Sequence, residues 1–162
     1  MPPAALFDIR QIDFSKVLVD IEGIRKVNPQ RYEMEHLTAI VHIEPSQHLI
    51  VGYKDVTEKE FWCRGHMPDY PLMPGVIICE AAAQLSAYYC RSNGLLGDGD
   101  FIAFGGLENV RFRGPVRPGD RLVLVAKATK VNRRQVLSTA QGYVNNTMVF
   151  QGDIIGLPFA RE

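Results

Sequence analysis

Neither acidic nor basic residues are in excess in this chain of 162 residues, because eighteen Lys and Arg balance eighteen Asp and Glu. Without a net charge, the chain has no overall field that would draw it to nucleic acid or to an anionic membrane. No apolar run approaches the roughly 20 residues that cross a membrane as a helix. The start of the chain, MPPAALFDIRQIDF, has no basic segment followed by a continuous apolar run, so it does not read as a secretory signal.

Cysteine is scarce, with Cys63, Cys79 and Cys90 an odd set that has no paired metal-binding spacing. This pattern favours reduced thiols in a cytoplasmic protein. The length suits one domain with a proper core and is too short for two ordinary ones. We expect an N-terminal arm over residues 1–19, lying on the domain or on a partner subunit, and a single domain over residues 20–162.

Metal ligands are also poorly represented. His36, His42 and His48 are spaced six residues apart, but Pro45 interrupts their register and no acid or cysteine completes a plausible set. The sequence therefore predicts no metal site.

What the chain does have is a distinctive stretch from Cys63 to Tyr89, CRGHMPDYPLMPGVIICEAAAQLSAYY. Its second half, Val76 to Tyr89, would form a helix with apolar residues on all sides except at Glu80, Gln84 and Ser86. This pattern is typical of a helix surrounded by protein. Glu80 is therefore expected to be buried. Removing a carboxylate from water costs several kcal/mol unless it finds a partner or keeps its proton, and such groups gather at functional sites. The structural alternative is that Glu80 has no role in chemistry and, as an acid in the first turn, only complements the helix dipole.

The first half of this stretch contributes a histidine. His66 lies in a loop that Pro68, Pro71 and Pro74 make rigid, fourteen positions before Glu80. The loop leads into a helix N-terminus whose first backbone N–H groups, at Gly75 and perhaps Val76, have no partner within the helix. A general base, an acid and an oxyanion site are thereby predicted together.

The remaining elements predict an α+β fold in which an antiparallel sheet of about six strands wraps around the long central helix. Val17 to Val27 has the apolar spacing of a short helix. Gly97-Asp98-Gly99-Asp100 predicts a flexible link, and Asn145-Asn146 a hairpin turn. The predicted strands are Leu37 to Glu44, Gln47 to Tyr53, Phe101 to Arg113, Asp120 to Val131, Gln135 to Val144 and Met148 to Leu157.

Three motifs resemble a known family, the β-hydroxyacyl-acyl carrier protein dehydratases of fatty acid synthesis, which are hotdog-fold enzymes. The motifs are Gly65-His66-x-Pro68 with Pro71-Leu72-Met73-Pro74-Gly75-Val76, then Glu80-Ala81-x-Ala83-Gln84, and finally the strand and turn from Asn109 to Asp120 that ends Pro115-Val116-Arg117-Pro118-Gly119-Asp120. With a weaker match near Asp20 to Tyr32, the resemblance covers most of Asp20 to Leu157.

The resemblance implies dehydration of a 3-hydroxyacyl group on acyl carrier protein to the trans-2-enoyl product, with no metal and no organic cofactor. It implies His66 as base, Glu80 as acid, and a hotdog dimer in which the histidine of one subunit meets the acid of the other. Such dimers often assemble into a trimer of dimers. A glutamate at position 80, where isomerase relatives have aspartate, favours dehydration without isomerisation. Met67, Pro74 and Gln84 are candidates to line the substrate tunnel.

A second local feature is positive charge. Eight basic residues against one acid, Asp120, lie between Arg111 and Arg134. Such a patch would steer an acidic carrier protein, although the same residues are equally consistent with solvated strand faces pointing in different directions. Nucleic acid is the weaker interpretation, because aromatic residues do not interleave with the charges. The candidate docking residues are Arg111, Arg113, Arg117, Arg133 and Arg134.

The sequence departs from the family at Gln30-Arg31-Tyr32-Glu33, which replaces a usual His-Arg-Tyr-Pro stretch, at the polar Glu35 and His36, and at Met67 in place of phenylalanine. These changes leave the proposed chemistry intact, but the family's pocket shape and acyl-chain preference do not carry over to this chain. Two other functions use the same pocket: a hotdog thioesterase, in which an acid directs water onto the thioester, and a catalytically silent acyl-binding paralogue. The presence of both His66 and Glu80 argues against the second.

Overall fold

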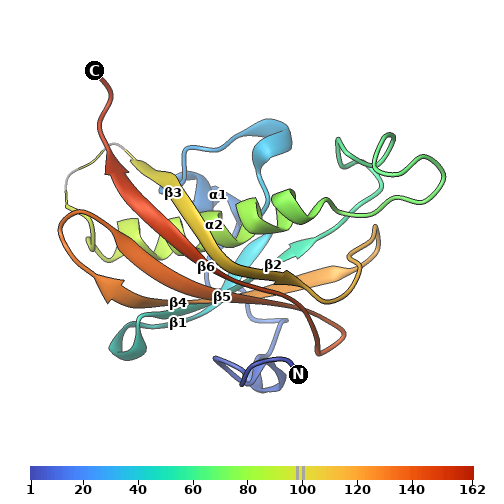
Figure 1. Cartoon of the computed structure of the whole chain (residues 1–162), viewed down its shortest axis with the longest axis horizontal. Coiled ribbons are helices and arrows are strands. Elements are labelled where there is room, and N and C mark those ends of the chain that lie inside the picture. Colours follow the sequence, from blue (N-terminus) through green and yellow to red (C-terminus); the bar gives the residue numbers. More distant parts are fainter. Residues whose placement is uncertain (98, 100) are drawn as a thin grey trace.

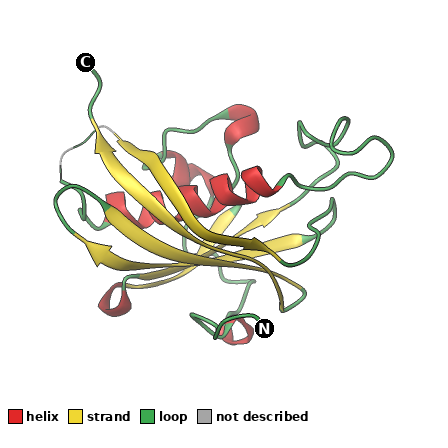
Figure 2. Ribbon diagram, viewed as in Figure 1, coloured by secondary structure: helices red, strands yellow, loops and turns green. Residues whose placement is uncertain are grey.

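The computed structural model describes residues 1–97, 99 and 101–162. Six strands form one antiparallel sheet in the order β1-β2-β4-β5-β6-β3, and a long helix, α2, lies across the inner face of its curve (Figure 1, Figure 2). The α+β prediction is confirmed. The strands are β1 (Ala39–Glu44), β2 (Leu49–Asp55), β3 (Phe101–Phe112), β4 (Arg121–Val131), β5 (Val136–Val144) and β6 (Thr147–Phe159). The predicted link at Gly97 to Asp100 includes Asp98 and Asp100, which lie outside the described residues.

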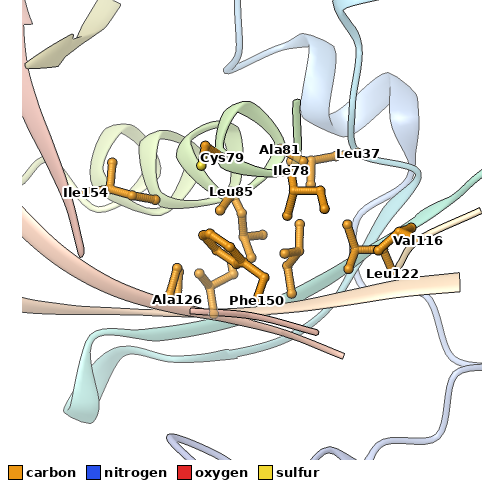
Figure 3. Packing of buried hydrophobic residues seen from close by; sticks show 14 of the residues in the cluster. Leu37, Ile78, Cys79, Ala81, Leu85, Val116, Leu122, Ala126, Phe150 and Ile154 are labelled. Carbon is orange, nitrogen blue, oxygen red and sulfur yellow. The ribbon is translucent and has the colours of Figure 1, made fainter. Parts of the chain in front are cut away.

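Helix α2 (Gly75–Ser92) packs on the sheet through small and aliphatic side chains. Figure 3 shows Ile78 and Leu85 of the helix facing Phe150 of β6 across the main core. Gly52 of β2 permits this close approach, since a Cβ there would meet Leu85 Cδ1 at 2.9 Å. Beyond the helix, Gly94 has a φ of +64°, as predicted for the residue that stops it.

The opposite face of the sheet is covered by the N-terminal arm, which Figure 1 shows on the side away from α2. Ile9 of the arm packs with Val51 and Val125 in a second apolar cluster. The buried Gln141 fixes the arm's backbone, since it accepts from Leu6 N at 2.8 Å and donates to Ala4 O at 2.9 Å. Central strands β2 and β4 are therefore buried on both faces. The division of the chain at residues 19 and 20 stays a prediction.

The helix predicted over Val17 to Val27 is shorter than expected. Helix α1 covers only Ile21–Arg25, and Asp20 caps it by accepting from Gly23 N at 2.9 Å. Val19 instead forms a β-bridge with Ile40. The apolar spacing suggested a longer helix because it counted Val17 and Leu18, which are exposed at 47% and 58% and precede the helix.

Short turns join the strands as the sequence predicts. Asn145 and Asn146 have φ of +47° and +62° between β5 and β6, and a 3₁₀ turn, η3 (Pro45–Gln47), joins β1 to β2. Two further 3₁₀ turns are η1 (Ile9–Gln11) and η2 (Tyr32–Met34). Among the described residues, no helix combines the length and apolar character needed to cross a membrane.

Candidate active site

His66 is held in a single orientation by the loop that precedes α2. Its Nδ1 lies 2.7 Å from the carbonyl oxygen of Leu72, while Leu72 N donates to His66 O at 2.8 Å. A carbonyl oxygen only accepts, so Nδ1 carries the proton and Nε2 keeps a free lone pair. The neutral imidazole is thus in the tautomer that a general base requires. The ring is partly exposed, at the end of the molecule where α2 begins.

The N-terminus of α2 is the predicted oxyanion site. Pro74 precedes the helix, and its carbonyl accepts from Ile77 N at 2.9 Å and Ile78 N at 3.1 Å. In the described part of the chain, the N–H groups of Gly75 and Val76 have no hydrogen-bond partner, as helix geometry dictates. The Cα of Gly75 lies against a ring, because a Cβ there would be only 2.6 Å from Phe112 Cζ.

Glu80 is partly exposed in the single chain, so the prediction that this chain buries it is wrong. It belongs to a partly exposed stripe on α2, in which Glu80, Ala83 and Ala87 face a cavity and Val76, at 73% exposure, faces solvent. The helix is apolar on this side as well, but a sequence pattern does not distinguish burial by the same chain from burial by a partner.

Gln84 connects Glu80 to the loop above the helix. Its Nε2 donates to Glu80 Oε1 at 2.9 Å and to Met34 O at 2.8 Å, while its Oε1 accepts from His36 N at 3.0 Å. The side chain is itself buried. This network fixes one oxygen of the Glu80 carboxyl as an acceptor and leaves the other oxygen available for chemistry.

Glu80 and Gln84 line a cavity of about 410 Å³ between α2 and strands β3, β5 and β6. This is within the range of small-molecule sites. Most of the wall is apolar or small. The other lining residues are Pro29, Gln30, Ala83, Ser86, Ala87, Cys90, Phe101, Ile102, Ala103, Phe104, Val136, Ser138, Ile154, Ile155, Gly156 and Arg161. Burial raises the pKa of the Cys90 thiol to about 12, so this wall residue stays uncharged.

The predicted residues thus fall into two groups. Glu80 and Gln84 share the cavity, but His66, Met67, Pro74, Gly75 and Val76 are not among its lining residues within one chain. Of this second group, Met67 and Val76 are exposed. The strand residues of the wall were missed from the sequence because no motif joins positions so far apart. The one available signal was Gln30, which departs from the family pattern and lies in the cavity wall.

A buried polar cluster lies behind Gln84. His36 is 0% exposed, and neither ring nitrogen has a partner in the described part of the molecule. Burial, and secondarily the charge of Lys54, lowers the pKa of His36 to about 4. Lys54 Nζ in turn pairs with Glu60 Oε1 at 3.0 Å. No group of three or more His, Cys, Asp or Glu among the described residues is arranged to hold a metal ion.

The basic residues do not gather in one patch. Arg117 lies beside the His66 loop, with its guanidinium carbon 3.9 Å from the centre of the Tyr70 ring and its Nε 3.4 Å from Pro71 O. Arg133 and Arg134 lie in the turn between β4 and β5. Strand β4 separates them from Arg117, and its 11 residues correspond to a length of about 35 Å.

A curved antiparallel sheet around one long helix is the hotdog fold. The heterocomplex described as the dehydratase ApeI:P from Xenorhabdus doucetiae has a similar structure, with a TM-score of 0.71 at 13% identity, covering 83% of this chain and 90% of that one. A family model described as a FabA-like domain matches residues 28–153. The chain belongs to this FabA-like family.

Two relatives are each named 3-hydroxyacyl-[acyl-carrier-protein] dehydratase FabZ. The one from Desulfotalea psychrophila is 37% identical over 85% of this chain and 91% of its own length. The one from Fusobacterium nucleatum is 36% identical over 82% of this chain and 92% of its own length.

Proposed function

We propose that this protein dehydrates 3-hydroxyacyl-acyl carrier protein to trans-2-enoyl-acyl carrier protein in the synthesis of fatty acids or related acyl chains. The observation that carries the proposal is the 37% identity over 85% of the chain to an enzyme named for this reaction. The site geometry agrees with it, because His66 presents a free Nε2 and Glu80 lies in a cavity of suitable size.

In the proposed step, His66 Nε2 takes the proton from C2 of the acyl chain. The electron pair of that C–H bond forms the C2–C3 double bond, and the C3–O bond breaks with its pair remaining on oxygen. That oxygen takes a proton from Glu80 and leaves as water. The proton held by His66 then returns to Glu80, so both groups are reset without a cofactor.

Charge that develops on the thioester oxygen needs a donor near the reacting carbon. The N–H groups of Gly75 and Val76 at the start of α2 supply it, and the positive end of the helix dipole adds to them. An oxyanion donor of this kind contributes about 10²–10³-fold to the rate. Pro74 and Met67 flank this entrance and would contact the thioester arm.

A second subunit would complete the site. Two features support a homodimer: the partly exposed stripe of α2 around Glu80, and the edge strand β3 with its exposed Phe104, Leu107 and Phe112. A long, exposed apolar edge strand promotes aggregation unless another chain pairs with it. Pairing there would bring the His66 loop of the partner toward the cavity that holds Glu80. The trimer of dimers implied by the resemblance remains part of this proposal.

Docking of the acidic carrier protein is proposed at Arg111, Arg113 and Arg117, which lie on β3 and the loop beside His66. Arg133 and Arg134 form a second candidate area at the far end of β4. The free thiols of all three cysteines fit the cytoplasmic location proposed for the enzyme.

Incubation with a 3-hydroxyacyl-acyl carrier protein tests the function. Formation of the enoyl thioester, followed by its ultraviolet absorbance and by mass spectrometry, supports dehydration. Release of free thiol would instead identify a thioesterase, and binding without turnover would identify a silent paralogue. A series of chain lengths on carrier protein and on coenzyme A would then define the natural substrate.

A further inference from the structure

The cavity that holds Glu80 extends along helix α2 toward the C-terminal end of the helix. Its helical wall is a stripe in which Glu80, Gln84, Ala87 and Cys90 follow one another at spacings of three or four residues. Each residue of an α-helix advances about 1.5 Å, so Glu80 and Cys90 are separated by about 15 Å along the axis. The cavity is therefore elongated, with the Glu80 carboxyl near one end and the Cys90 thiol near the other.

Three side chains close the far end of this cavity. Cys90, Phe101 and Ile102 line it, and the same three residues also line a second, smaller cavity of about 70 Å³. The Phe101 ring packs on the Phe159 ring, with centroids 4.8 Å apart. These three side chains therefore form a partition between two cavities.

Between its ends the elongated cavity has mainly small and apolar side chains. Ala83 and Ala87 leave room beside the helix, and the sheet contributes Phe104, Val136 and Ile154. Each methylene group buried against such a wall favours binding by roughly fourfold. The interior of the cavity is thus suited to a hydrocarbon chain.

We propose that this cavity limits the acyl chain of the substrate to about 12 carbons, with Cys90 and Phe101 as its end wall. The inference rests on the proposed dehydration, in which Glu80 gives a proton to the oxygen on C3, so that C3 lies beside Glu80. Contact between a terminal methyl group and the end wall takes about 4 Å of the 15 Å. An extended chain advances about 1.2 Å per bond, so the remaining 11 Å holds roughly nine bonds beyond C3.

A second subunit provides the competing interpretation. Glu80, Ala83 and Ala87 are partly exposed, and in the proposed homodimer a side chain of the partner would fill the space beside them. In that case the residues of this wall would stabilise the dimer, and the rate of the enzyme would not depend on them through the length of the substrate.

A series of 3-hydroxyacyl-acyl carrier proteins with 4 to 16 carbons separates these two cases. We expect kcat/KM to rise with each added methylene group up to about 12 carbons, by as much as about fourfold each, and to fall by at least about tenfold at 16 carbons.

Two substitutions should move the limit in opposite directions. Ala87 lies about 10 Å beyond Glu80 along the helix, so Ala87→Leu obstructs the cavity before its end. The ratio of kcat/KM for the 12-carbon to that for the 4-carbon substrate should fall at least about tenfold. Phe101→Ala removes part of the partition and joins the second cavity to the first. The ratio for the 16-carbon to the 12-carbon substrate should then rise at least about tenfold.

Phe159→Ala is the matched control, because it removes the other ring of the same pair and Phe159 is not among the described residues that line either cavity. It should keep the wild-type ratios. Size-exclusion chromatography shows whether Ala87→Leu assembles as the wild type does, and if it does not, Phe101→Ala decides.

Three results would overturn the inference: a kcat/KM that is the same at every chain length, no gain on the 16-carbon substrate in Phe101→Ala, or an equal gain in Phe159→Ala. Unchanged ratios in a normally assembled Ala87→Leu protein would do the same. A 4-carbon substrate has only one carbon beyond C3 and does not reach Ala87. Failure of the wild-type enzyme to dehydrate this substrate and all longer ones therefore overturns the dehydration itself, separately from the length limit.

Discussion

His66 and Leu72 hold each other through two hydrogen bonds, from the His66 ring to Leu72 O at 2.7 Å and from Leu72 N to His66 O at 2.8 Å. The acceptor is a backbone carbonyl, so the ring tautomer is set by the fold of the loop and not by a second side chain. Many catalytic histidines use a carboxylate for this purpose. Here the loop itself orients the base, and its three prolines restrict the backbone that carries this contact.

Replacing this base tests the mechanism directly. His66→Ala should lower kcat by about 10²–10⁴-fold, the contribution of a general base, while the melting temperature changes little because the ring is partly exposed. Steady-state kinetics and thermal unfolding measure the two quantities. His42→Ala is the matched control, since His42 packs on Phe7 of the N-terminal arm. Turnover near the wild-type rate in His66→Ala would remove His66 from the reaction.

Glu80→Gln should also abolish turnover, because the amide has no proton of suitable acidity to give to the leaving hydroxyl. Its Oε1 still accepts from Gln84 Nε2, so the network around the helix is kept. Circular dichroism and size-exclusion chromatography should therefore match the wild type. An active Glu80→Gln enzyme would show that the acid is another group.

Gln84 links stability to catalysis. Gln84→Leu leaves the buried His36 N and the less buried Met34 O without their partner, and a buried group left unpaired costs about 1–3 kcal/mol of unfolding free energy. We expect a loss of at least about 2 kcal/mol in urea unfolding and a lower kcat, because Glu80 is no longer held. Equal stability of Gln84→Leu and wild type would contradict the network.

The sequence predicted the fold well because its signals are local. Alternating and β-branched runs identified the strands, and the Asn145-Asn146 turn has the positive φ that asparagine tolerates. It failed where the outcome depends on tertiary context. Val19 is extended because Ile40 pairs with it, and Glu80 is partly exposed because it faces a cavity and not a packed side chain of the sheet. Gln30 lines the cavity from a loop that is held by hydrogen bonds of Arg31 and Asn28, which no local pattern predicts.

His36 should make stability depend on pH. Its pKa falls from 6.5 to about 4 on folding, so the unfolded chain binds the extra proton between these values. The unfolding free energy should therefore be fully present above about pH 6.5 and decrease as the pH falls toward 4. A shift of this size corresponds to about 3 kcal/mol. The charged groups facing the ring are Lys54, which lowers its pKa, and Glu60, which raises it.

The contribution of His36 is isolated by comparison with His36→Leu. Urea unfolding of both proteins between pH 4.5 and 7.5 gives the slope of unfolding free energy against pH for each. Carboxylates such as Glu35 contribute equally to the two slopes. The leucine variant should lose less stability on acidification, so its unfolding free energy relative to that of the wild type should rise as the pH falls. Parallel curves would show that His36 titrates alike in the folded and unfolded states.

The N-terminal arm should stabilise the sheet that it covers. Ile9 is buried against Val51 and Val125, so Ile9→Ala should cost about 2–4 kcal/mol of unfolding free energy. Leu18→Ala is the matched control, because Leu18 is 58% exposed and should change stability by less than about 0.5 kcal/mol. Equal effects of the two substitutions would indicate that the arm is not held on the sheet in solution.

Gly75 should tolerate no side chain, for two separable reasons. A Cβ at this position would lie 2.6 Å from Phe112 Cζ, so the ring must move, and the methyl group would also stand over the N–H that we assign to the oxyanion. Gly75→Ala should therefore lower both the melting temperature and kcat, the latter by up to about 10²-fold. Adding Phe112→Leu should restore the melting temperature but not kcat. Gly65→Ala is the control for the melting temperature, since a Cβ there meets nothing within 4 Å. Recovery of kcat in the double variant would mean that the ring, and not access to the helix N-terminus, limits the reaction.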